Sequence, residues 1–138
     1  MKDNYIYVWL KDGRICRTTE ENIRDGYFSD VTYIEEETYD GDIRNGKRSG
    51  HGTYVSPGRL IYIGEWLNDM PHGTGFEQKA DGTSYRGEFR EGKYWGQGTY
   101  EDALGNVIEG SFVEGIPEGW CITRYHNQES YEGNYKND

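Results

Sequence analysis

The stretch from Tyr62 to Ser84 reads YIGEWLNDMPHGTGFEQKADGTS, and its pattern recurs every 23 residues from residue 39 onward. No gap is needed to align the blocks 39–61, 62–84, 85–107 and 108–130, and a partial block covers 131–138. The third position is always glycine: Gly41, Gly64, Gly87, Gly110 and Gly133. A fixed period of this length is typical of repeat architectures, in which neighbouring units stack and bury one another.

Each block is predicted to form one β-hairpin. Positions 1 and 5 carry large apolar residues around the glycine at position 3, and alternate residues of a strand share a face. A turn is expected at positions 7 and 8, as at Asn45 and Gly46, because such residues reach positive φ easily. Single hairpins are marginally stable, so they are expected to stack. The fold class predicted is all-β: an elongated, single-layer, twisted antiparallel sheet of stacked 23-residue hairpins.

The mid-strand glycines need a physical reason, because glycine weakens a strand interior. We expect an aromatic ring to lie against the backbone there, which only a residue without a Cβ permits. Block 108–130 departs from the pattern, with Ile108 at position 1 and Cys121 in place of glycine at position 14. An irregular second strand is expected in that block.

Residues 1–38 lack the repeat and are predicted to form an irregular N-terminal cap. We expect a hairpin turning at residues 11–14, a single helical turn through residues 19–26, and a degenerate strand over residues 28–34. Solenoids need atypical ends that shield the terminal repeats from solvent and from edge pairing. At the other end, the strand from Tyr131 to Lys136 offers an open edge for a homodimer.

The chain of 138 residues is acidic, with 25 Asp and Glu against 15 Lys and Arg and a net charge of −10. This field repels the phosphates of nucleic acid and anionic lipid head groups, so neither nucleic acid nor membrane is the expected partner. There is no apolar run of about 18 residues and no signal-peptide pattern. Cys16 and Cys121 are lone thiols, typical of a reducing compartment. A cytoplasmic protein with another protein as its partner is expected.

No catalytic, metal or cofactor site is predicted. His51 and His72 lie beside glycines and are expected to pack and form hydrogen bonds rather than hold a metal. The sequence contains neither a nucleophile elbow nor a phosphate-binding loop. At position 4 an acidic column is predicted on a polar face, formed by Asp42, Glu65 and Glu88. The column either keeps the repeats soluble or receives a basic peptide.

Aromatic residues are abundant, with 13 Tyr, 4 Trp and 4 Phe. Two alternatives account for them: the rings form the core by stacking on neighbouring glycines, or part of the row stays open as a groove for a partner helix or peptide. The candidate groove residues are Tyr62, Trp66, Tyr85, Phe89, Trp95, Tyr100, Phe112 and Tyr131. Trp95 is the first residue to test.

The pattern Tyr-x-Gly-x-aromatic, then a turn, then His/Pro-x-Gly-x-Gly and a late Asp-Gly, resembles the MORN repeat (membrane occupation and recognition nexus). The resemblance covers residues 39–138, and block 62–84 carries it best. It implies a non-catalytic scaffold that binds protein in cytoskeletal or ciliary assemblies.

Two other functions are compatible with the resemblance. MORN repeats precede the catalytic part of certain SET-domain lysine methyltransferases and plant phosphatidylinositol-phosphate kinases, so the chain is alternatively the accessory portion of a larger enzyme. The family name suggests phospholipid binding, which the net charge opposes.

Overall fold

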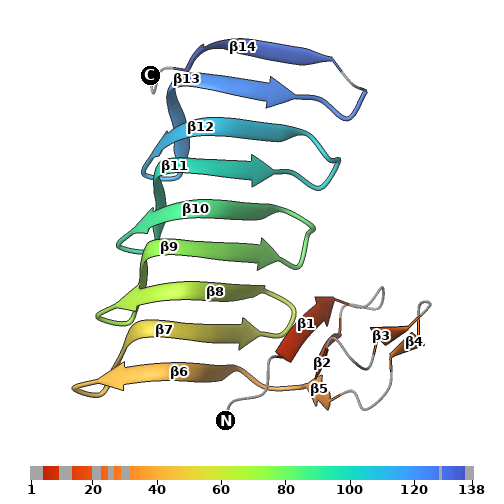
Figure 1. Cartoon of the computed structure of the whole chain (residues 1–138), viewed down its shortest axis with the longest axis vertical. Helices are drawn as coiled ribbons and strands as arrows, with labels where there is room; N and C mark the ends of the chain where they lie inside the picture. Colours follow the sequence, from red (N-terminus) through yellow and green to blue (C-terminus); the bar gives the residue numbers. More distant parts are fainter. Residues whose placement is uncertain are drawn as a thin grey trace.

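The computed structural model describes residues 5–9, 14–19, 23–24, 27–28, 32–127 and 129–135, and every regular element among them is a β-strand. Nine strands form one antiparallel sheet in chain order, from β6 at one edge to β14 at the other (Figure 1). They are β6 (Thr38–Arg44), β7 (Lys47–Ser56), β8 (Leu60–Leu67), β9 (Met70–Lys79), β10 (Ser84–Arg90), β11 (Lys93–Glu101), β12 (Val107–Val113), β13 (Ile116–Arg124) and β14 (Ser130–Tyr135). The predicted all-β, open, elongated sheet of stacked hairpins is confirmed.

The tight turns of the hairpins lie along the left edge of the sheet in Figure 1. Asn45 and Gly46 have φ of 53° and 77°, and Glu91 and Gly92 have φ of 48° and 82°. Two consecutive positive φ values are the signature of the type I′ turn, whose twist matches that of paired strands. The predicted turn at positions 7 and 8 is therefore present.

A column of glycines crosses the sheet near the middle of its strands. Gly64 pairs directly with Gly75 inside one hairpin, and with Gly52 of the preceding hairpin. The ring of Tyr62 lies over Gly75, so that a Cβ on this glycine would be 2.6 Å from Cζ of the tyrosine. The expected close approach of a ring to a glycine backbone is thus present, although the ring covers the glycine at position 14 and not the one at position 3. The glycine at position 3 instead faces the backbone of its partner glycine.

Every hairpin also contains a β-bulge, which the sequence analysis did not predict. Between the pairs Gly64–Gly75 and Trp66–Pro71, one residue of β8 opposes three residues of β9. The other three complete hairpins shift register at the same place. The glycine at position 12 lies in this bulge with positive φ, 96° at Gly73, a conformation that residues with a Cβ rarely adopt.

The core is a row of aromatic rings on one face of the sheet, which we call the aromatic face. Tyr62 meets Trp66 of its own repeat at a centroid distance of 5.0 Å, and Phe89 of the next repeat at 5.0 Å, both edge to face. Tyr85 contacts Phe112 in the same way at 5.2 Å. Edge-to-face pairs stabilise by about 0.5–1.5 kcal/mol beyond the area they bury. The rings therefore join each repeat to its neighbour.

The N-terminal segment packs on the opposite face, beside β6–β8 (Figure 1). Its described strands are β1 (Tyr5–Trp9), β2 (Ile15–Thr19), β3 (Ile23–Arg24), β4 (Tyr27–Phe28) and β5 (Thr32–Ile34). Ile15 is buried in a second cluster with Val55 and Ile61. Val55 and Ile61 are next to Tyr54 and Tyr62 in the sequence. Because side chains alternate along a strand, Val55 and Ile61 point away from the aromatic face.

One prediction for this segment is wrong, the helical turn over residues 19–26. Ile23–Arg24 is instead a strand paired with Tyr27–Phe28. The Asp-Gly dipeptide between these strands is a hairpin signal, and one isolated helical turn is unstable in water. The predicted hairpin around residues 11–14 corresponds to the pairing of β1 with β2, and the strand predicted over 28–34 to the end of β4 and to β5. Residues 10–13, 20–22, 25–26 and 29–31 lie outside the described residues.

The irregular strand expected in block 108–130 is also wrong, because β13 pairs with both neighbours and has the same bulge as the second strands of the other complete hairpins. In block 62–84 the hydroxyl of Tyr62 lies beside Gly64, whereas Ile108 has no hydroxyl to place beside Gly110. Cys121 occupies that space, and a Cβ on Gly110 would be 2.7 Å from its Sγ. The loss of a tyrosine at position 1 and the gain of a side chain at position 14 compensate each other.

This compensation makes a testable prediction about stability. Ile108→Tyr alone places a ring where Cys121 lies, and we expect it to lower the free energy of unfolding by about 1–3 kcal/mol, as overpacking does. The double variant Ile108→Tyr/Cys121→Gly restores the arrangement of the other repeats and should recover most of that loss. Urea denaturation measures both variants, and equal stabilities would contradict the compensation.

Candidate functional site

Six of the eight predicted groove residues lie in the core or pack against it, and two lie apart from it. Five are buried, with at most 5% of their surface exposed: Tyr62, Trp66, Tyr85, Phe89 and Phe112. Tyr100 packs against this cluster and is half-buried. The burial supports the first alternative, in which the rings form the core, for these six residues.

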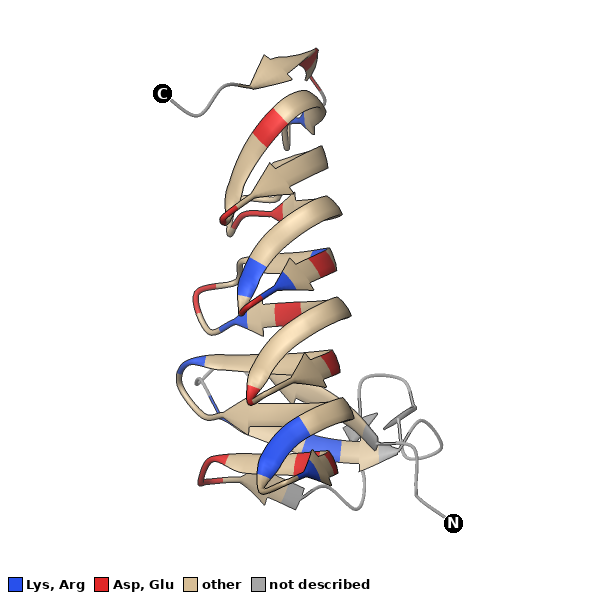
Figure 2. Ribbon diagram, turned by 90° about the vertical axis from the view of Figure 1, so that its left-hand side faces the viewer, with Lys and Arg blue, Asp and Glu red and all other residues tan. Residues whose placement is uncertain are grey.

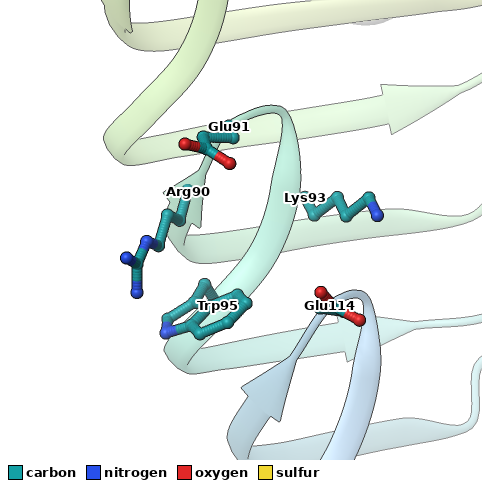
Figure 3. Close-up of a pocket in the computed structure, with 5 residues that line it drawn as sticks. All are labelled: Arg90, Glu91, Lys93, Trp95 and Glu114. Carbon is teal, nitrogen blue, oxygen red and sulfur yellow. The ribbon is translucent and has the colours of Figure 1, made fainter.

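The other two predicted residues lie apart from that core. Trp95 is half-buried in a pocket with Arg90, Glu91, Lys93 and Glu114 (Figure 3), and the guanidinium of Arg90 lies 4.8 Å from the centroid of its ring. Its neighbour in the sequence, Tyr94, belongs to the core packing, so alternation along β11 directs Trp95 to the other side. Tyr131, 49% exposed, lies on the last strand.

Two adjoining pockets lie on the aromatic face, over the buried rings. Their volumes are about 230 and 280 Å³, and Glu77 and Gly92 line both. The first pocket is completed by Arg48, Tyr54, Leu60, Tyr62, Trp66, Asp69 and Pro71. The second is completed by Lys79, Lys93, Tyr94 and Gly115. We call the two pockets together the aromatic-face groove.

The hairpin turns form one wall of this groove and are fixed in series. The backbone N–H of the second turn residue donates to the carbonyl of position 10 in the preceding block. Gly92 donates to Pro71 over 2.9 Å, and Gly115 donates to Tyr94 over 3.0 Å. Each turn is thereby held by the hairpin before it, which fixes the position of this wall.

Arg48 and Asp69 close the groove at the first pocket. The guanidinium of Arg48 lies 4.5 Å from the ring centroid of Trp66, and its Nε is 3.2 Å from the Asp69 carboxylate. The backbone N–H and the side chain of Arg48 donate to that carboxylate, and they lower the pKa of Asp69. Asp69 itself has φ of 70°, where glycine stands in the other turns.

Tyr94 and Glu77 form the floor where the two pockets meet. The hydroxyl of Tyr94 donates to the Glu77 carboxylate over 2.7 Å, while its ring stacks on Tyr85 at 4.0 Å. Burial, and then the carboxylate of Glu77, raise the pKa of Tyr94. Burial likewise raises the pKa of Tyr62, and that of Tyr85 to about 12.

Four residues that line the groove were not among those predicted: Tyr54, Leu60, Glu77 and Tyr94. Tyr54 and Glu77 stand at position 16, two residues beyond the glycine that the tyrosine ring covers. The alternation of a strand would have placed them on the same face. Tyr94 at position 10 was missed because that position follows the turn, and only the bulge brings it over the core.

The acidic column has a role inside the first three hairpins. Asp42 accepts a hydrogen bond from the backbone N–H of His51 over 3.0 Å, Glu65 from that of Thr74 over 2.5 Å, and Glu88 from that of Gln97 over 2.5 Å. These donors lie in the bulge, where the shift of register removes regular strand partners. The three carboxylates therefore satisfy backbone groups that the bulge leaves without a strand partner.

His72 forms a hydrogen bond to the next hairpin. Nδ1 of His72 accepts the backbone N–H of Glu91 over 3.4 Å. Within the described residues, no group of three His, Cys, Asp or Glu side chains is placed to hold a metal ion, and no helix is long and apolar enough to cross a membrane.

Comparison with protein families gives one match. The family model of the MORN repeat matches residues 39–59, 62–84 and 85–107. These three ranges fall on the first three complete hairpins, and the unmatched fourth block is the one that carries Ile108 and Cys121. A search of curated proteins found no match to the chain.

The raised tyrosine pKa values predict a loss of stability at alkaline pH. The folded state disfavours the ionised form, so the stabilisation is complete below the ordinary tyrosine pKa of about 10 and declines as the pH rises above it. We expect the absorbance of tyrosinate from the buried tyrosines to appear together with the loss of the β-sheet circular dichroism signal. Tyr94→Phe removes one such group and should make the decline shallower. Full ionisation in a folded chain would contradict this.

Asp69 provides a second prediction, which separates its side-chain bonds from its backbone strain. Asp69→Ala loses the bonds to Arg48 and keeps an L residue at φ of 70°, whereas Asp69→Gly loses the same bonds and relieves the strain. The melting temperature should therefore fall in the order wild type, Asp69→Gly, Asp69→Ala. An alanine variant at least as stable as the glycine variant would show that the backbone is not strained.

Proposed function

The chain belongs to the MORN-repeat family, and from that premise we propose that it is a non-catalytic scaffold module that holds a helix or extended peptide of another protein in the aromatic-face groove. MORN repeats are typically protein- or membrane-interaction modules and are generally non-catalytic. The proposal goes further by naming a surface and the kind of partner that the surface receives.

The observation that carries the proposal is the continuity of the groove. Its two pockets share Glu77 and Gly92 and lie over consecutive repeats, so one elongated segment can contact several hairpins at once. The lining mixes rings and apolar carbons, such as Tyr54 and Leu60, with charged groups at the edges. Aromatic surface bordered by polar groups is characteristic of protein interfaces.

The rigidity of the wall supports the same function. The backbone bonds from Gly92 and Gly115 fix the turns relative to the preceding hairpins. A groove that is already formed loses little conformational entropy when a segment enters, which favours affinity.

Charge favours protein over membrane or nucleic acid as the partner. The net charge of −10 opposes anionic lipids and phosphates. Residues of both signs are distributed along the turn side of the sheet, as Figure 2 shows. An intracellular scaffold, of the kind found in cytoskeletal assemblies, is the setting we propose.

A matched pair of substitutions tests the groove. Leu60 lines the first pocket, whereas Ile63, 42% exposed, lies three residues along the same strand on the opposite face. Because Leu60→Glu places a charged group in the apolar lining of the first pocket, we expect it to reduce capture of partner proteins in affinity purification by about tenfold or more, which corresponds to about 1.4 kcal/mol.

Ile63→Glu is the control and should leave capture unchanged. Circular dichroism establishes that both variants fold. If the folded Leu60→Glu variant captures partners as the wild type does, or if only Ile63→Glu loses them, the groove is not the binding surface.

A further inference from the structure

The repeat distance along the groove constrains the conformation of its occupant. Each block contributes two strands, and neighbouring strands lie about 4.7–4.9 Å apart, so equivalent points in successive blocks are separated by about 9.6 Å. The turn residues Asp69, Gly92 and Gly115 are such equivalent points, and they border the two pockets of the groove. A bound segment must therefore present one side chain every 9.6 Å or so, always toward the same side.

Regular conformations of a peptide meet this requirement to different degrees. A polyproline II helix advances about 3.1 Å per residue with three residues per turn, so residues i and i+3 point the same way about 9.3 Å apart. A β-strand directs alternate residues to one side, at intervals of about 6.6 Å, which miss the second pocket. In an α-helix, residues i and i+7 are about 10.5 Å apart and drift by about 20°. The polyproline II spacing is the closest fit.

The surface of the first pocket suits such a segment. Tyr54, Trp66 and Pro71 provide flat apolar surface, and Leu60 closes the pocket beside them. Grooves lined by aromatic rings bind polyproline II segments because these are stiff and lose little entropy on binding. The first pocket is therefore suited to a proline or another apolar side chain.

The second pocket differs from the first in having two lysine side chains in its lining. Lys79 and Lys93 line it and are exposed, and among the described residues no ion pair is found for either of them. Figure 3 shows the side chain of Lys93 extending away from Glu91 and Trp95. In the first pocket, by contrast, Arg48 is bound to Asp69. The second pocket thus presents two lysines and one carboxylate, Glu77, which already accepts the hydroxyl of Tyr94, so cations outnumber anions in its lining.

We propose that the aromatic-face groove binds a polyproline II segment that places an apolar residue in the first pocket and, three residues along the segment, an acidic residue in the second. This rests on the function proposed above and specifies the conformation and the chemistry of the partner. The net charge of −10 opposes an acidic residue at long range, but salt screens charges beyond about 8 Å, so the nearby Lys79 and Lys93 have the larger effect in the second pocket.

Selection of peptides from a random display library on the immobilised full chain tests this proposal. We expect the recovered peptides to be enriched in proline and to carry an apolar and an acidic residue three positions apart, in either chain direction. Synthetic peptides with a Leu-Pro-Pro-Asp centre should bind, and separation of Leu from Asp by two or four positions should weaken binding by about tenfold, measured by fluorescence anisotropy.

Charge reversal identifies the second pocket. The double variant Lys79→Glu/Lys93→Glu should bind peptides with Lys at the acidic position better than peptides with Asp, the reverse of the wild-type preference. Lys47→Glu is the control, since this exposed lysine lies outside both pockets, and it should leave the preference intact.

The outcomes distinguish this proposal from the proposed function. If the recovered peptides have apolar and acidic residues seven positions apart and lose binding with Leu60→Glu, the groove is the binding site but its occupant is a helix, and the polyproline II proposal is overturned. If no peptide is recovered, or if binding is insensitive to Leu60→Glu, both proposals fail.

Discussion

The contact between a tyrosine ring and a glycine backbone is the constraint on which this fold depends. In the second repeat, the ring of Tyr62 lies over Gly75 and its hydroxyl donates to the carbonyl of Glu65 over 2.7 Å. No Cβ fits beneath the ring, and the hydrogen bond holds the ring in place. The same ring packs edge to face with Phe89 of the next repeat. A local contact inside one hairpin thereby becomes the means by which hairpins stack.

The β-bulge has a comparable role on the turn side. The extra residues of the second strand free backbone donors, and the carboxylate at position 4 accepts one of them, as Glu65 does for Thr74. The bulge also brings position 10 over the core, where Tyr94 stacks on Tyr85 and bonds to Glu77. A flat sheet would have exposed its rings directly to water. The bulge instead raises a wall beside them, and the groove lies between this wall and the rings.

The aromatic residues thus form the core with some of their rings and line the aromatic-face groove with others. The inner rings, such as Tyr85 and Phe112, are closed off by their neighbours and hold the sheet together. The outer rings, such as Tyr54 and Tyr94, cover them on one side and line the groove on the other. In a solenoid each repeat contacts only its neighbours, so stability is close to a sum of nearest-neighbour terms. The groove is therefore a property of adjacent repeats together.

The period of the glycines, the hairpin in each block, the positive-φ turns and the family resemblance were all readable in the sequence, because they depend on spacing along one strand or one turn. The sequence did not show whether the aromatic row is buried or open, since this depends on which side chains cover each ring. Tyr94 entered the site only through the bulge, and Cys121 replaced a hydroxyl that comes from the facing strand. The helical turn near Ile23 failed for a related reason, because pairing with Tyr27–Phe28 outweighed a weak local preference. Patterns within a strand are set by covalent spacing, whereas contacts across strands are set by register, and register shifted where the chain needed an extra residue.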